Sequence, residues 1–388
     1  MCFAAELLHS VRVASLFQLQ LRALKSRNIR TFFVFAALFI VSRVATFPAE
    51  LTTSIPPQSG IFTNPIVIGA DPWFFQHDGN YVWSRKGPNE SIVVGVTRDF
   101  TKPGEHRIVW RAPASGPCSR EIWAPEIHRI GERWYIYFAA SDGRNENHRM
   151  WVLESAADDP FSDYTVRGPI YTGDHPETGV TNRWAIDASL FSLRGERYMV
   201  WSGWRDERDI QWLYIARMKD PFTLATRRVE LCNNDDYLWE RVDEKLTGRG
   251  LHEGPQILRR SNRVFLIYSC SGSWQASYKL GLLELKPDGD PLNPSHWTKH
   301  PKPVFASTPE TFGVGHNCFV KSPDGMEDWI LYHSKLDRTE GWRRVIHAQP
   351  FRWTDDGFPD FGEPVARGIP LPLPSGSNLR NETVQNAN

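Results

Sequence analysis

The stretch DASLFSLRGERYMVWSG, Asp187 to Gly203, contains the pattern that decides the fold. A polar residue begins it, a short apolar run follows, Gly195 marks a turn, and a second run is rich in aromatic and β-branched residues. Two such runs on either side of a glycine turn are typical of a β-hairpin. The aspartate at its head is unexpected, because aspartate is one of the residues least suited to a strand.

Four more segments of the chain share this pattern, and the five heads recur at intervals of roughly 55 to 65 residues. The other four are DPWFFQHDGNYVWS from Asp71, PEIHRIGERWYIYFAAS from Pro125, EGPQILRRSNRVFLIYS from Glu253 and HNCFVKSPDGMEDWILYHS from His316. Self-similarity at a fixed period indicates a repeat architecture, and about 60 residues accommodate the four strands of one propeller blade. We therefore predict an all-β fold, a five-bladed β-propeller over residues 60–374.

The composition agrees with many short strands and excludes some partners. Aromatic residues make up 13% of the chain, with 16 Trp, 28 Gly and 28 Pro; aromatics favour strands, and Gly and Pro favour turns. The 45 basic and 45 acidic side chains balance, so no nucleic-acid partner is expected. We expect a monomer. Neither a sandwich nor an α/β fold predicts five similar hairpins at a constant period, and long stretches of helical periodicity are missing after the leader.

The first 50 residues differ from the rest and resemble a signal peptide or leader. Basic residues precede the apolar run FFVFAALFIV, residues 32–41, and small residues follow it. The run is shorter than the roughly 20 residues of a membrane span. We expect a secreted, extracellular protein without stable membrane association once the leader is cleaved; an uncleaved anchor and a buried helix are the alternatives. Residues 375–388 are expected to form a flexible C-terminal tail.

The heads of the five hairpins carry ionisable residues, namely Asp71, Glu126, Asp187, Glu253 and His316. The innermost strand of each blade lines the central channel, so these heads are expected to meet near one mouth of it. An aspartate at a strand start is often only a turn or capping residue, but five ionisable heads are harder to explain in that way. Close carboxylates raise the pKa of at least one of them, and a protonated carboxyl beside an ionised one suits glycoside hydrolysis.

The segments GADPW, WAPEI, WAIDAS, HEGPQIL and GVGHN, in this order and spacing, resemble glycoside hydrolase family 43. The similarity runs from about Asn64 to Pro372. It implies a five-bladed propeller that acts on arabinose- or xylose-containing polysaccharides or oligosaccharides. The longer strings NRWAIDAS, YSCSGSW and GHNCFVKSPDGMEDWILYH are most similar to the exo-acting α-L-arabinofuranosidase and arabinanase branch.

The resemblance also implies roles for three carboxyl groups. Asp71 would be the general base that activates water, Glu253 the general acid, and Asp187 the residue that raises the pKa of the acid and orients it. The family inverts the anomeric configuration, so we expect the carboxyls of Asp71 and Glu253 to lie roughly 6.5 to 9.5 Å apart.

Other candidate site residues are less specific. By resemblance, His316 would contact a calcium ion or water near the propeller axis; no other cofactor is expected. Glu126 would line the channel or contact a sugar hydroxyl. Trp73 and Trp123 are candidate sugar-stacking residues, although most tryptophans must belong to the blade core. One of Arg343 and Arg344 would add a guanidinium to the pocket.

The predicted function is release of α-L-arabinofuranosyl residues from plant cell-wall arabinan or arabinoxylan. A β-xylosidase or a hydrolase of mixed specificity remains the alternative within the family. A carbohydrate-binding propeller without catalysis is a further alternative. Such a protein would keep the aromatic residues without needing all three carboxylates.

Once the leader is removed, four cysteines remain, Cys118, Cys232, Cys270 and Cys318, and their pairing is open.

Overall fold

The computed structural model describes residues 60–175, 182–206, 209–242 and 249–377. The described residues all belong to one compact unit of the chain, Pro57–Asn388. The predicted leader and most of the predicted tail lie outside the described residues. Within the described residues, the helices are short 3-10 turns, η1 (Asn145–Asn147), η2 (Leu238–Glu240) and η4 (Pro294–His296). None of them is long and apolar enough to span a bilayer.

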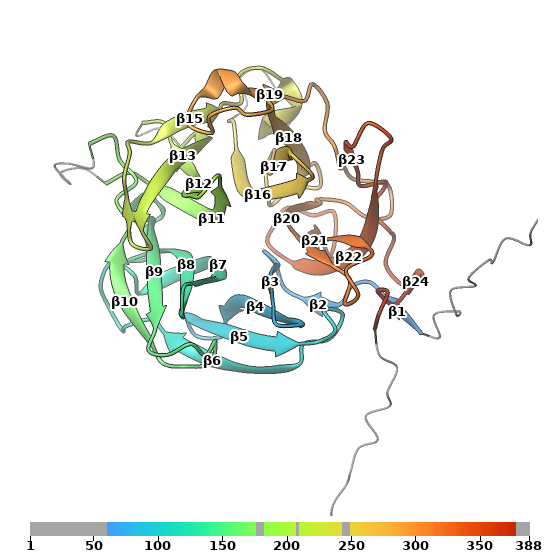
Figure 1. Cartoon of the computed structure of the whole chain (residues 1–388), viewed down its shortest axis with the longest axis horizontal. Helices are drawn as coiled ribbons and strands as arrows, with labels where there is room; N and C mark the ends of the chain where they lie inside the picture. Colours follow the sequence, from blue (N-terminus) through green and yellow to red (C-terminus); the bar gives the residue numbers. More distant parts are fainter. Residues whose placement is uncertain (1–59, 176–181, 207–208, 243–248, 378–388) are drawn as a thin grey trace, which may run out of the picture. The chain divides into compact units, whose positions relative to one another are not determined.

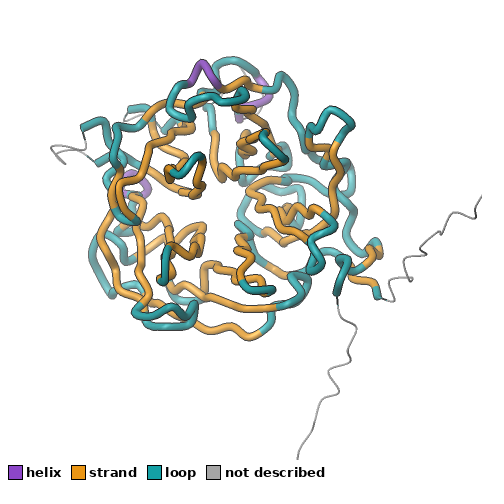
Figure 2. Tube along the Cα trace, in the orientation of Figure 1, coloured by secondary structure: helices purple, strands orange, loops and turns teal. Residues whose placement is uncertain are grey.

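Five antiparallel sheets surround a common centre (Figure 1), which confirms the predicted five-bladed β-propeller. Each sheet begins with one of the five predicted hairpins: β3 (Trp73–His77) with β4 (Asn80–Gly87), β7 (Arg120–Ile130) with β8 (Arg133–Ser141), β11 (Ala185–Leu193) with β12 (Glu196–Trp204), β16 (His252–Arg260) with β17 (Arg263–Cys270), and β20 (Gly315–Lys321) with β21 (Asp328–Lys335). The first strand of each pair lies nearest the centre of the ring, and loops connect the strands around it (Figure 2).

The outer strands complete the blades in chain order. They are β5 (Ser91–Thr97) and β6 (Glu105–Arg111), β9 (Arg149–Ser155) and β10 (Tyr164–Pro169), β13 (Gln211–Asp220) with β14 (Thr223–Leu224) and β15 (Val229–Cys232), β18 (Lys279–Leu285) and β19 (Trp297–Lys299), and β22 (Arg344–Trp353) with β23 (Pro359–Asp360). The middle strands read as continuous apolar runs because both of their faces are covered. In β8, every residue after the first is buried.

Strands from both ends of the described chain close the ring. The N-terminal strand β2 (Val67–Ile68) pairs with β22 and so completes the fifth blade. Next to it, β1 (Ile61–Thr63) pairs with β24 (Pro370–Pro372) in a separate two-stranded sheet. The outer strand of the main sheet of the last blade therefore comes from the N-terminal side of the chain.

The hydrophobic core consists of layers between neighbouring blades. Each of five buried clusters in the described part of the chain draws on two adjacent sheets. Between the second and third blades, for example, Tyr137 packs in one cluster with Met199 and Trp201, all of them fully buried. Aromatic side chains bury large apolar areas, which accounts for the high tryptophan content. The four cysteines of the described chain are free thiols inside these layers.

A left-handed backbone conformation recurs within the first five residues of each inner strand or, in the first blade, two residues before it. The residues are Asp71 (φ 53°), Ala124 (φ 41°), Asp187 (φ 56°), Gly254 (φ 55°) and His316 (φ 43°). In the last four blades, the pairing with the second strand shifts register at this point. Such a bulge re-aims the side chain, and non-glycine residues with this backbone are uncommon and often functional.

The left-handed positions show that the five hairpin heads are not all equivalent. Ala124, not Glu126, is the second-blade counterpart of Asp71, and Glu126 lies two residues further along β7. In the fourth blade, Gly254 holds the equivalent position and Glu253 precedes it. The prediction that five ionisable residues occupy homologous positions is therefore wrong for Glu126 and displaced by one residue for Glu253.

Candidate active site

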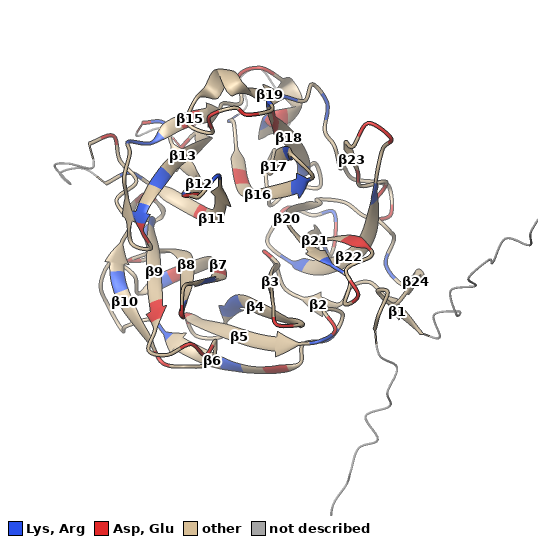
Figure 3. Cartoon of the chain, viewed as in Figure 1, with Lys and Arg blue, Asp and Glu red and all other residues tan. Residues whose placement is uncertain are grey.

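A cleft of about 1110 Å³ collects residues from all five blades. The sequence-predicted residues that line it are Asp71, Trp123, Asp187, Glu253 and His316. Acidic and basic residues occur together around the ring (Figure 3). A large cleft with convergent ionisable groups is the usual form of a small-molecule site.

Asp71 is surrounded by groups that favour its ionised form. Its Oδ1 lies 3.3 Å from a guanidinium nitrogen of Arg344, 3.3 Å from His316 Nδ1 and 3.2 Å from His333 Nδ1. Burial alone would raise the pKa of Asp71, but Arg344 and the two histidines outweigh it and hold that pKa well below its usual value. Asp71 is therefore a carboxylate throughout the neutral and mildly acidic range.

Glu253 has the opposite electrostatic environment. Burial is the main cause that raises its pKa to about 7, and the nearby negative charge of Asp71 adds to it. The hydroxyl of Tyr278 donates a hydrogen bond to Glu253 Oε1 at 2.8 Å, which partly opposes that rise. Glu253 therefore exchanges a proton near neutral pH, as a general acid requires.

Asp187 lies beside both of these carboxyls. Its Oδ2 accepts a hydrogen bond from the Gly254 amide at 3.0 Å. Burial and the charges of Glu253 and Asp71 raise the pKa of Asp187 well above its usual value. Two interacting carboxyls titrate as a pair, so Asp187 and Glu253 together retain a proton near neutral pH while Asp71 stays ionised.

His316 lies between two of the carboxylates, 3.3 Å from Asp71 Oδ1 and 3.7 Å from Asp187 Oδ2 through Nδ1. Burial lowers the pKa of His316. Calcium binds six to eight oxygens, whereas the two carboxylates here are already bonded to Arg344 and to the amide of Gly254. This donor set does not fit the calcium ion expected near the axis, and the mechanism proposed below involves no metal.

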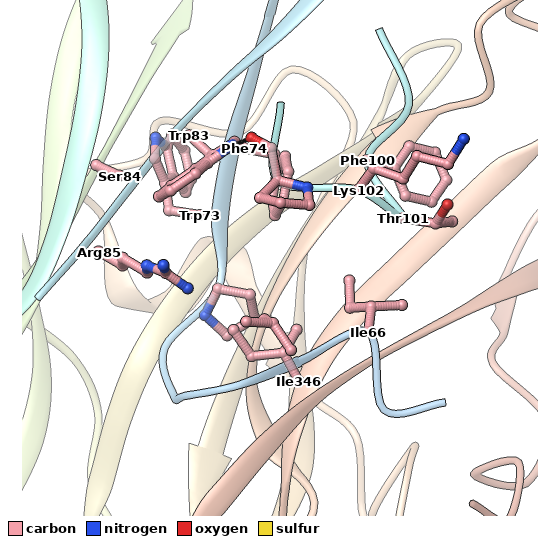
Figure 4. A pocket seen from close by; sticks show the side chains of 13 residues that line it. Ile66, Trp73, Phe74, Trp83, Ser84, Arg85, Phe100, Thr101, Lys102 and Ile346 are labelled. Atoms are coloured by element: carbon pink, nitrogen blue, oxygen red, sulfur yellow. Dashed lines mark hydrogen bonds between the residues drawn. The ribbon is translucent and has the colours of Figure 1, made fainter. Parts of the chain in front are cut away.

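The two predicted sugar-stacking tryptophans occupy different places. Trp123 lines the cleft and stacks on His148, with ring centroids 3.8 Å apart. Trp73 instead lies in the wall of a small apolar cavity of about 40 Å³ (Figure 4), which is too small for a sugar ring. Its indole nitrogen donates to the carbonyl of Ile127 at 2.7 Å. Trp73 is thus part of the packing between the first two blades.

Glu126 is also outside the cleft lining. It is buried, and its Oε1 accepts a short hydrogen bond of 2.5 Å from Gln256 Nε2. Its other oxygen is 3.2 Å from His128 Nε2. Burial raises the pKa of Glu126 well above its usual value. Of its two predicted roles, polar lining of the inner strands fits this position.

Three residues of the site were missed or left open by sequence reasoning. Arg344, rather than Arg343, turns towards Asp71; Arg343 is exposed and pairs with Asp337. His333 gave one usable signal, an imidazole at the end of the apolar strand WILYHS, which the blade core does not need. Tyr278 gave none, because a tyrosine near a strand start is indistinguishable from core.

The profile of glycosyl hydrolases family 43 matches residues 62–359, which span every blade of the propeller. The chain belongs to glycoside hydrolase family 43. The resemblance stated from the motifs is thereby confirmed, and the protein is a glycoside hydrolase.

Several named relatives of this family 43 hydrolase are arabinofuranosidases. The chain is 32% identical over 353 residues to "Alpha-L-arabinofuranosidase 43" of Humicola insolens, covering 87% of this chain and 70% of the relative. It is 34% identical over 338 residues to the "Extracellular exo-alpha-(1->5)-L-arabinofuranosidase" of Streptomyces avermitilis, covering 83% and 67%. A solved α-L-arabinofuranosidase of Lactobacillus brevis superposes with a TM-score of 0.72 at 32% identity, covering 79% of this chain and 98% of that one. The resemblance to the arabinofuranosidase branch is confirmed.

A buried polar network adjoins Glu253 in this family 43 hydrolase through its chain neighbour His252. The imidazole of His252 has Nδ1 3.7 Å from Cys232 Sγ and Nε2 3.1 Å from Glu240 Oε1. Lys299 Nζ donates to the other oxygen of Glu240 at 3.0 Å. Although Cys, His and Glu are all metal-ligand types, this imidazole directs one nitrogen to each partner. One ligand atom from each of the three residues lies within 4.8 Å of the others, and the contacts of Glu240 with His252 and Lys299 make the network a set of buried ion pairs.

Replacing Glu240 with glutamine should lower the free energy of unfolding by about 3 kcal/mol, the low end for a broken buried ion pair. Burial opposes a charged imidazole, but Cys232 and Glu240 raise the pKa of His252 to about 9, so it is a cation at neutral pH. The variant would leave this cation and Lys299 without their fully buried carboxylate. Urea unfolding followed by tryptophan fluorescence measures the loss.

The matched control for this change is Glu284→Gln. Glu284 makes a bidentate pair with Arg263 at 2.7 and 2.8 Å, and both side chains are about a quarter exposed. Removing a solvent-accessible pair should cost less than about 1 kcal/mol. Equal losses in the two variants would contradict the buried-network interpretation.

Proposed function

We propose that this hydrolase is a secreted α-L-arabinofuranosidase that removes arabinofuranosyl residues from arabinan or arabinoxylan with inversion of configuration. The observation that carries the proposal is the contrast between Asp71 and Glu253 in one cleft. Three nitrogen groups stabilise the first as a carboxylate, whereas burial favours the protonated form of the second. Carboxyls whose environments separate their pKa values are the expected acid and base of a glycosidase. The names of the relatives support the choice of sugar.

In the proposed reaction, a water molecule attacks the anomeric carbon while the bond to the leaving oxygen breaks. Asp71 takes a proton from that water, and Glu253 gives its proton to the leaving oxygen, so charge is conserved. Asp187 titrates together with Glu253 as a neighbouring carboxyl and, through the Gly254 amide, fixes the backbone next to it. Proton transfer through solvent then restores both carboxyls for the next turnover.

The proposal of secretion rests on the leader predicted for residues 1–50 and on the word "extracellular" in the names of two Streptomyces relatives. We further propose that the hydrolase acts as a monomer, because each ionisable group of the proposed mechanism comes from one chain.

Product analysis on arabinan, arabinoxylan and xylan tests the proposed function, with the anomer of the first product followed by NMR. We expect free arabinose from the first two polymers, released initially as the β-anomer. Xylose from xylan without arabinose would assign the hydrolase to the β-xylosidases. An α-anomer as first product would mean retention and would remove Asp71 from the role of base.

A further inference from the structure

An exposed tryptophan in the cleft has no role in the chemistry proposed above. Trp342 lies between β21 and β22, lines the cleft, and is 61% exposed. Among the described residues it is the one exposed tryptophan in a chain whose other indoles are mostly core. A large apolar side chain left in water inside a binding cleft indicates a contact with a ligand.

Trp342 packs against a second indole of the cleft, Trp274, and hydrogen bonds between their loops fix both residues. Their ring centroids are 5.7 Å apart with planes at 63°. The amide of Gly341 donates to the carbonyl of Trp274 at 3.0 Å, and Lys335 Nζ donates to the carbonyl of Gly341 at 2.6 Å. Gln275 Nε2 donates to Glu340 Oε1 at 3.2 Å across the same junction. Two loops of neighbouring blades thus fix the indole pair in place.

The pair lies beside the general acid. Ser273, the residue before Trp274, hydrogen-bonds to Glu253. On the other side, the guanidinium of Arg344 lies 5.6 Å from the ring centroid of Trp342 while it also binds Asp71. The loop that carries Trp274 therefore adjoins the place of the leaving oxygen, because Glu253 has to reach that oxygen to protonate it.

We infer that Trp274 and Trp342 form the platform that binds the sugar residue on the leaving-group side of the scissile bond. This inference rests on the proposed arabinofuranosidase function. The C–H face of an uncharged furanose is apolar and matches an indole surface, and a preformed platform binds it with little loss of side-chain freedom. The platform would favour substrates with at least one further sugar beyond the bond that is cleaved.

The test measures kcat/KM of each variant on two substrates. Arabinotriose reaches the platform, whereas methyl α-L-arabinofuranoside carries an aglycone too small to cover it. For Trp342→Ala, we expect the ratio of kcat/KM for arabinotriose to that for the methyl glycoside to fall about tenfold, mainly through the KM of arabinotriose. Burial of about 50 Å² of apolar surface corresponds to a change of that size. Trp342→Phe keeps a flat aromatic face and should retain most of the ratio.

Met326→Ala is the matched control, because Met326 is 80% exposed and lies outside the cleft lining. It should leave the ratio within about twofold of the wild-type value. An unchanged ratio in Trp342→Ala would overturn the inference while the arabinofuranosidase activity stands. A wild-type protein that hydrolyses neither arabinoside would instead overturn the proposed function on which the inference depends.

Discussion

Asp71→Asn is expected to lower kcat/KM on arabino-oligosaccharides roughly a hundredfold to ten-thousandfold, the range that a general base contributes. Asparagine removes the charge but keeps the size, and it adopts the left-handed backbone of this position more readily than most residues. The ring that holds the site should therefore stay intact. Initial rates of arabinose release, measured at pH 6, give the loss.

The control for this variant is Asp78→Asn on the same hairpin. Asp78 also has positive φ, but its side chain is 83% exposed and outside the cleft lining, and its rates should stay within about twofold of wild type. Added sodium azide should restore activity to Asp71→Gly. Glycine tolerates the backbone conformation and leaves room for the anion to attack the anomeric carbon. Hydrolysis by Asp71→Asn at the wild-type rate would rule out Asp71 as the base.

Glu253→Gln is expected to cost a similar factor on natural substrates and much less on nitrophenyl arabinofuranoside, whose leaving group departs without a proton. The wild-type enzyme needs Glu253 protonated. Because its pKa is raised to about 7, activity is present below that pH and is lost as the pH rises through it. The pH profile of kcat/KM on arabino-oligosaccharides should show this alkaline limb in the wild type, and the residual activity of Glu253→Gln should lack it.

Tyr278→Phe separates the role of Glu253 from a general disturbance of the site. The tyrosine hydroxyl donates to Glu253 Oε1 and so lowers the pKa of that carboxyl. Without this donor, the alkaline limb should move to higher pH while the enzyme remains active. An alkaline limb that persists in Glu253→Gln would assign the proton to another group.

The repeat pattern predicted the architecture because each hairpin carries its own alternation, turn and aromatic strand. It also placed Asp71, Asp187, Glu253 and His316 in one cleft, since inner strands of a propeller have to converge. The finer position of each head could not be predicted. Whether Ala124 or Glu126 takes the left-handed position depends on a one-residue bulge, and the alternation of apolar residues does not report it.

Contacts between distant loops could not be predicted from the sequence for a different reason. Trp73 follows Asp71 by two residues, yet the strand turns its indole towards the carbonyl of Ile127. The network around Glu240 joins four segments that have no common spacing in the chain. Such contacts depend on how connecting loops fold back, and loop conformation follows from tertiary packing more than from local pattern.

Closure of the ring by β2 links catalytic competence to the completion of folding. Asp71 follows β2 by three residues, and Arg344 begins β22, the strand with which β2 pairs. The proposed base and the cation that keeps it ionised thus come from opposite ends of the propeller and meet only at its seam. A chain whose ring is not closed would not hold Asp71 beside Arg344 and opposite Glu253, so we expect it to be inert towards glycans. Hydrolysis then reports that the ring is closed.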